Sequence, residues 1–158
     1  MAMLTPARSR ASQKTRGSFA IVASSYNAQY VDTMLRAAKK TLRAARADRV
    51  IVVRVPGAYE IPVVAARLAR AQEPRLSAII CLGVILRGAT THAQHIGEAV
   101  SQALVTIQVQ HEVPIIHEVL LLENHQQARE RCLDAKHNRG VEAAQTALTM
   151  AEVMRSIP

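Results

Sequence analysis

The residues best suited to chemistry lie in the stretch 83–92, directly after a short apolar run at residues 77–82. The run is rich in β-branched residues and predicts a buried strand, whereas from Thr90 onward apolar residues recur at helical spacing. A turn between a strand and a helix brings backbone N–H groups and the positive end of the helix dipole together. With Arg87 and Gly88 in this turn, the sequence predicts a phosphate site.

His92 falls in the first turn of the expected helix, for which Thr90 or Thr91 is a natural N-cap. A helix N-terminus disfavours imidazolium and a bound phosphate favours it, so this side chain could transfer protons near neutral pH. A cap or a solvated surface group is the alternative interpretation. His92 and His95 are also spaced as metal ligands can be, but no third ligand at a fixed spacing is evident, and we expect no metal.

The surrounding pattern predicts the scaffold. Apolar strands at residues 18–23, 50–55, 77–82 and 113–122 alternate with amphipathic helices. This alternation predicts a three-layer α/β/α fold, flavodoxin-like, with a four-stranded parallel sheet and helices on both faces. Ligands of such sheets bind beyond the carboxyl ends of the strands. The turns expected to converge there are residues 24–27, 56–60, 84–92 and 117–124.

Two side chains in these turns complement the phosphate site. Tyr26 offers a flat ring for stacking, with half-buried packing as the alternative role. Glu60 offers a carboxylate for hydroxyl or ring N–H groups, with helix-start electrostatics as the alternative. Their convergence with residues 87–92 favours a binding site for a small anionic molecule.

The chain has 158 residues, which suits one domain at 17–158 after a basic tail at 1–16 that we expect to be disordered. Lys and Arg number 20 against 12 Asp and Glu, and the acid-free tail could contact nucleic acid or mimic a transit peptide. The remaining basic residues lack interleaved aromatics, so no nucleic-acid surface is expected. Cys81 and Cys132 lack metal-ligand spacing and predict reduced thiols in a cytoplasmic protein, and no apolar run is long enough to span a membrane.

Four motifs in this order closely resemble the lumazine synthase family. They are PGAYEIP at residues 56–62, LGVILRGATTH at 82–92, ENHQQARER at 123–131 and NRGVEAA at 138–144. The resemblance runs from about residue 18 to the C-terminus. It implies a transferase that condenses 5-amino-6-(D-ribitylamino)uracil with 3,4-dihydroxy-2-butanone 4-phosphate, in the penultimate step of riboflavin biosynthesis. The products are 6,7-dimethyl-8-ribityllumazine, inorganic phosphate and water, and no cofactor is implied.

The resemblance also assigns roles to residues. Proton transfer falls on His92, and phosphate binding falls on Ala89, Thr90 and Arg131. Pyrimidine and ribityl contacts fall on Tyr26, Ala58, Tyr59, Glu60, Val84, Ile85, Leu86 and His117.

The chain departs from the family pattern at several positions. His117 and Glu118 stand where the family usually has phenylalanine and glycine, and that phenylalanine reaches the pyrimidine bound by a neighbouring subunit. The resemblance therefore implies a homo-oligomer built from pentamers, with active sites between subunits. Leu133 and His137 replace glycines that capsid-forming members often carry, which favours a free pentamer or a pair of pentamers over a sixty-subunit shell.

The partners that the resemblance implies are the small-molecule substrates and, as a pathway partner, riboflavin synthase. No interaction with a membrane is expected. The alternative function is a non-catalytic scaffold of the same fold that binds a flavin or a ribityl ligand. Retention of His92 and Arg131 argues against this alternative, because a carrier needs neither a proton shuttle nor a clamp for a leaving phosphate.

Overall fold

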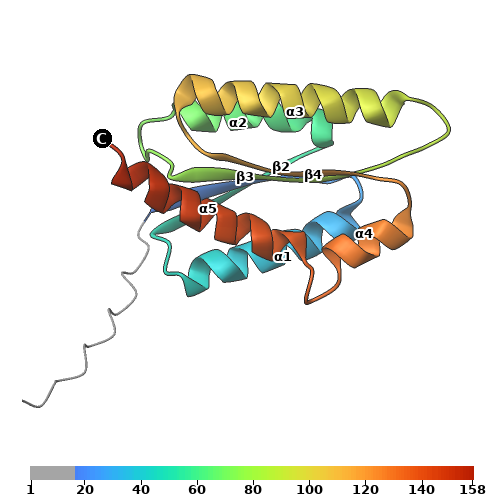
Figure 1. Ribbon diagram of the computed structural model, residues 1–158, viewed down its shortest axis with the longest axis horizontal. Helices are drawn as coiled ribbons and strands as arrows, with labels where there is room; N and C mark the ends of the chain where they lie inside the picture. The colour runs from blue at the N-terminus through green and yellow to red at the C-terminus, as the bar shows by residue number, and fades with distance from the viewer. Residues whose placement is uncertain (1–16) are drawn as a thin grey trace, which may run out of the picture.

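The computed structural model describes residues 17–158, and the expected basic tail at 1–16 lies outside the described residues. In chain order the elements are β1 (Ser18–Ser24), α1 (Ala28–Ala44), β2 (Arg49–Val55), η1 (Ala58–Glu60), α2 (Ile61–Arg70), β3 (Ala78–Leu86), α3 (His92–His111), β4 (Ile115–Leu122), α4 (His125–Cys132) and α5 (Arg139–Ser156). All strand pairs are parallel, in the order β2-β1-β3-β4. Helices α2 and α3 cover one face of the sheet, and α1, α4 and α5 cover the other (Figure 1). The predicted three-layer fold is therefore confirmed.

The central strand β1 shows how the sequence builds two cores. Successive side chains of a strand point to opposite faces of the sheet. Phe19 and Ile21 are fully buried in the core that includes α1 and α5, whereas Ala20 and Val22 are fully buried in the core that includes α2 and α3. Since both faces are covered, β1 is apolar along nearly its whole length, as parallel strands are.

Helix α5 packs on α1 through its smallest residues. The buried residues of α5 are Gly140, Ala143, Ala144, Ala147 and Ala151. At Gly140 the two backbones meet so closely that an added Cβ would overlap the carbonyl oxygen of Met34 and lie 2.7 Å from its Cα. The alanine-rich sequence thus permits direct contact between the two helix backbones.

Among the described residues, no helix combines the length and apolar character needed to cross a membrane.

Strand β3 is longer than predicted, because Gly83 continues the strand instead of ending it. An added Cβ at Gly83 would lie 3.2 Å from both Ser24 Oγ and Val119 Cγ1, which is closer than side chains normally pack. Glycine at this position therefore suits the close packing of Ser24 on β1 and Val119 on β4 around β3. Residues 84–86 form the last part of a strand and were wrongly predicted to be in a turn. His117 lies within β4, as the strand predicted at 113–122 implies, and not in the turn segment predicted to begin at residue 117.

The outer edge of β4 is partly capped by side chains of the same chain. The N–H of Ile115 donates to Oε1 of Gln108 at 2.9 Å, and the N–H of Val119 donates to Nδ1 of His117 at 3.1 Å. These amides face away from β3, because the alternate residues of β4 pair with that strand. Two outward donors of the edge strand are therefore already satisfied.

Candidate active site

A cavity of about 820 Å³ opens at the carboxyl ends of β1, β2 and β3, beside the start of α3. This is where ligands bind in open parallel sheets. It collects most of the residues to which the resemblance assigns substrate contacts or proton transfer. Those that line it are Tyr26, Ala58, Tyr59, Glu60, Val84, Ile85, Leu86 and His92. His117, Ala89, Thr90 and Arg131 do not line it.

The turn after β1 presents the ring of Tyr26, which is 67% exposed. The Tyr26 N–H donates to the carbonyl of Pro56 at 3.0 Å, which joins this turn to the end of β2. Asn27 adopts a left-handed backbone conformation with φ of 59°, and its Nδ2 donates to the carbonyl of Val84 at 2.8 Å. The turn is thereby tied to both neighbouring strands, so the position of the tyrosine ring is defined by the sheet.

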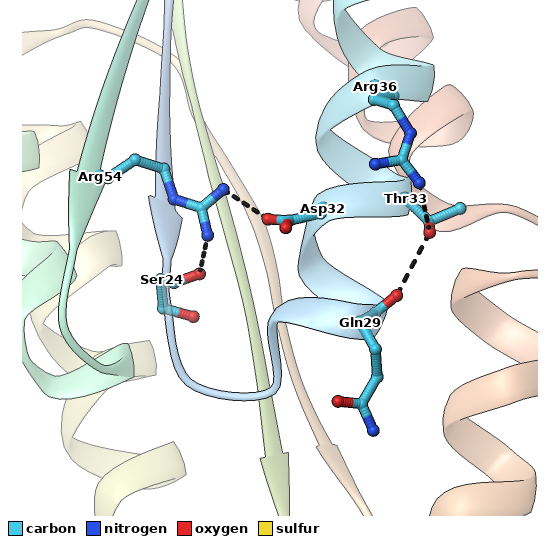
Figure 2. A network of polar contacts seen from close by, with 6 residues as sticks. All are labelled: Ser24, Gln29, Asp32, Thr33, Arg36 and Arg54. Atoms are coloured by element: carbon cyan, nitrogen blue, oxygen red, sulfur yellow. Dashed lines mark hydrogen bonds and ion pairs between the residues drawn. The ribbon is translucent and has the colours of Figure 1, made fainter.

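An arginine on β2 supports the same turn from the other side. The guanidinium of Arg54 donates to the backbone carbonyl of Ser24 at 3.0 Å and pairs with the carboxylate of Asp32 on α1 (Figure 2). Arg54 lies near the end of the edge strand β2, and its side chain is partly exposed. Its contacts connect β2, β1 and α1 at the point where the chain leaves the sheet for the cavity.

Gly57 and Glu60 shape the second wall. The N–H of Gly57 donates to Oε2 of Glu60 at 2.9 Å, which fixes that carboxylate at the start of α2. An added Cβ on Gly57 would lie 2.8 Å from the Tyr26 ring, so glycine lets the ring approach the backbone. Tyr59 lies between them in sequence and is 65% exposed. The exposed rings and the fixed carboxylate suit a flat polar molecule with hydroxyl or N–H donors.

The N-cap residue of α3 makes no hydrogen bond from its side chain to the first amides of the helix. Thr91 occupies the N-cap position but caps no backbone N–H. Its hydroxyl lies 3.3 Å from Nε2 of His95, and the hydroxyl of Thr90 accepts from the His92 N–H at 3.4 Å. Open helix N-terminal amides attract anions. His92 therefore lies on the cavity wall beside a place suited to phosphate.

Arg87 does not contribute to this site as the turn pattern predicts. Its Nε lies 3.1 Å from the carboxylate of Glu123, and its side chain lines a separate hollow between α3 and β4. The reason is that β3 continues to Leu86 and carries Arg87 past the cavity to the β4 side. The cation expected in the turn is thus paired elsewhere.

Arg131 lies on α4, a helix held in place by a side-chain cap at its start and by a contact with α1. Oδ1 of Asn124 accepts from the Gln127 N–H at 2.9 Å and so caps the N-terminus of this helix. The hydroxyl of the buried Tyr30 on α1 lies 2.6 Å from Nδ1 of His125. Within one subunit Arg131 nevertheless lines a different hollow, of about 360 Å³, instead of the cavity.

Charged side chains surround Arg131 in that hollow. Arg139 on α5 lies 3.5 Å from the carboxylate of Glu118 and also pairs with Glu142. Burial raises the pKa of the Glu118 carboxyl, and Glu142 adds to the rise, while Arg139 and Arg131 oppose it. Glu118 therefore introduces an acid beside the arginines at a position where the family usually has glycine.

His117 is held in its neutral form by its two hydrogen bonds. Nδ1 accepts from the Val119 N–H, so the proton must reside on Nε2, which lies 2.7 Å from the hydroxyl of Ser101. Burial lowers the pKa of His117 in agreement with this geometry. His117 contacts Ser101 on α3 and does not line the cavity at the carboxyl ends of β1, β2 and β3.

The sequence assigned no site role to five residues that line the cavity: Asn27, Gly57, His95, Ile96 and Ala99. The i, i+3 spacing of His92 and His95 was a usable signal, since residues three apart share a helix face. The same spacing also suits a pair of metal ligands. Within residues 17–158 no group of three or more His, Cys, Asp or Glu side chains is placed to hold a metal ion.

The two cysteines do not offer competing chemistry. Both are free and buried, and burial raises the pKa of Cys81 to about 12 and that of Cys132 to about 11. A thiol needs to ionise to act as a nucleophile. Both therefore act as packing residues, as the sequence predicted.

The fold and cavity define a class, namely α/β enzymes that bind small molecules at the carboxyl edge of a parallel sheet. Comparison with known proteins specifies the family. The family model for 6,7-dimethyl-8-ribityllumazine synthase matches residues 16–155, so the chain belongs to that family. A 6,7-dimethyl-8-ribityllumazine synthase of Stenotrophomonas maltophilia (strain R551-3) is 38% identical over 143 residues, covering 89% of this chain and 90% of that protein. One of Xanthomonas euvesicatoria pv. vesicatoria (strain 85-10) is 36% identical over 146 residues, covering 91% and 94%.

Proposed function

We propose that the cavity at the carboxyl ends of β1, β2 and β3 is where this chain forms 6,7-dimethyl-8-ribityllumazine. The observation that carries the proposal is that Tyr26, Glu60 and His92, from three separate segments, line one cavity. The pyrimidine stacks on the Tyr26 ring, and its ribityl hydroxyls donate to the fixed carboxylate of Glu60. The non-catalytic alternative is not favoured by the membership of this family.

The cavity wall at the start of α3 serves the phosphorylated ketone. Its phosphate binds at Ala89 and Thr90, against the first amides of α3. His92 then transfers protons as the amine adds to the ketone and the phosphate leaves. Orientation of the two substrates supplies much of the remaining acceleration.

His117 and Arg131 complete the cavity of a neighbouring subunit. Neither lines the cavity of its own chain, and both lie on other parts of the surface. Arg131 adds the cation that the phosphate needs, because Arg87 is already paired with Glu123. The imidazole of His117 takes the place of the family's phenylalanine against the pyrimidine.

Exposed apolar side chains support such an arrangement. Val63 on α2 is 70% exposed and Val52 on the edge strand β2 is 37% exposed, while Val105 and Val109 on α3 are 48% and 72% exposed. Helix α2 packs near β1, and α3 packs along β4, so the two patches lie toward opposite edges of the sheet. Contact between unlike patches joins subunits head to tail and closes into a ring. The pentameric number comes from the family resemblance. The cytoplasmic location is proposed from the two cysteines, both of which are free thiols.

The test of function is to mix the purified chain with both substrates and to follow lumazine by absorbance and phosphate by a colorimetric assay. Wild-type protein should form both products above the uncatalysed background. His92→Ala should lower the rate about 100-fold or more while leaving the size of the assembly unchanged. A wild-type rate equal to background would refute the function, and an unchanged rate in the variant would refute the role of His92.

A mixing experiment tests the shared site. His92→Ala and Arg131→Ala subunits are unfolded together, refolded and compared with each variant refolded alone. If the site spans two subunits, about a quarter of the sites in a random mixture combine both wild-type residues, and activity returns to that extent. Activity that stays at the level of the separate variants would contradict a site between subunits.

A further inference from the structure

His95 is a second imidazole on the wall of the cavity, and the established reaction leaves it without a role. It lies one helical turn after His92, and both side chains are exposed and line the same cavity. Residues three apart share one face of a helix. The two imidazoles therefore reach one bound substrate pair from the same helix.

A neighbouring hydroxyl contacts the imidazole of His95. Thr91 Oγ lies 3.3 Å from Nε2 of His95. Thr91 occupies the N-cap position of α3, where a threonine hydroxyl usually accepts from a backbone N–H, yet here it caps none. The hydroxyl contacts the imidazole of His95 instead.

The chemistry of the reaction requires proton transfer at more than one place. Phosphate leaves from one end of the four-carbon ketone, whereas the ring closes at a carbonyl carbon further along it. In ring closure the ribitylamino nitrogen forms a bond to that carbon and the C=O π electrons move to oxygen. The oxygen leaves as water, with one proton from the amine and one from a ring N–H of the pyrimidine. A single imidazole held beside the phosphate is poorly placed to move these later protons.

We propose that His95 is the acid–base residue of the ring-closing dehydration, oriented by Thr91, while His92 serves the earlier loss of phosphate. His95 accepts the amine proton and delivers it to the departing oxygen, so it ends the step in its starting form. This assignment rests on the proposed function of the cavity. It differs from a metal role, since the described residues provide no third ligand near the two histidines.

The experiment measures phosphate release and lumazine formation separately in single-turnover reactions, corrected for ring closure in buffer alone. His95→Gln should release phosphate within about twofold of the wild-type rate but form lumazine about 100-fold more slowly. Phosphate should therefore appear well ahead of lumazine. The matched control is His111→Gln, the same change at the far end of α3, which should leave both rates unchanged.

The outcomes separate this inference from the function on which it rests. Wild-type protein that forms neither product would refute the proposed function. If His95→Gln slows both products equally, or slows neither, the assignment of His95 is wrong while the function stands. Thr91→Val should reproduce part of the delay in lumazine formation and Thr91→Ser should restore the wild-type rate. Equal behaviour of these two variants would contradict the positioning role of Thr91.

Discussion

Replacing Gly140 with alanine tests the direct contact between the backbones of α5 and α1. The added Cβ would overlap the carbonyl oxygen of Met34 and lie 2.7 Å from its Cα. Non-bonded carbon atoms are most stable at about 3.5–4.0 Å, so α5 would have to move by about 1 Å. The obstacle is backbone and cannot change rotamer as a side chain would.

The cost follows from what moves with the helix. The fully buried residues Ala143, Ala144 and Ala147 lie on the face of α5 that joins the core with α1, so a shift loosens that whole contact. Overpacking of this kind costs about 1–3 kcal/mol or more, and the better helix propensity of alanine returns at most about 1 kcal/mol. With a net loss of about 2 kcal/mol, Tm should fall by about 4–8 °C in a chain of this size.

Urea and thermal unfolding at one protein concentration would measure the effect. The matched control is Gly97→Ala in α3, because an added Cβ there would lie 3.5 Å from Cδ2 of Leu121, an ordinary contact. That variant should be as stable as wild type or slightly more stable. If Gly140→Ala unfolds at the same Tm as Gly97→Ala, the direct approach of the two backbones is refuted.

Two other substitutions test the charged side chains around the hollow that Arg131 lines. Arg131→Ala should raise KM for the phosphorylated ketone about 10-fold or more, because a charge-assisted hydrogen bond is lost, while KM for the pyrimidine changes little in steady-state kinetics; an equal rise in both would contradict a phosphate role. Glu118→Gln should raise Tm at pH 8 by about 2–4 °C. Burial raises the pKa of this carboxyl, so the folded state binds the proton more tightly and wild-type stability is lost as pH rises through the folded pKa. The difference in Tm should therefore shrink at pH 5, and a larger difference at pH 5 would refute the argument.

The alternation of strands and helices predicted the layers and the parallel sheet because each element must bury an apolar face. The extent of β3 could not be predicted in the same way. In the sequence, Gly83 indicates the end of a strand. In the structure the glycine is explained by its close neighbours Ser24 and Val119, which come from segments distant in sequence. The extra residues of β3 then moved Arg87 away from the predicted phosphate turn.

The cavity residues were predicted in part because parallel strands bring their carboxyl ends to one edge. Tyr26, Glu60 and His92 meet there as expected. His95 was not assigned, since a local pattern shows which residues share a helix face but not which face lines a cavity. His117 and Arg131 do not line the cavity of their own chain, and the roles of both remain predictions.

The capped edge of β4 bears on the solubility of the newly made chain. A bare edge strand exposes a row of unpaired amides and can seed aggregation by adding strands from other chains. In β4 the outward amides of Ile115 and Val119 already donate within the chain. Acid would protonate His117 and remove the acceptor for the Val119 N–H, so the chain should keep its solubility best where this imidazole is neutral.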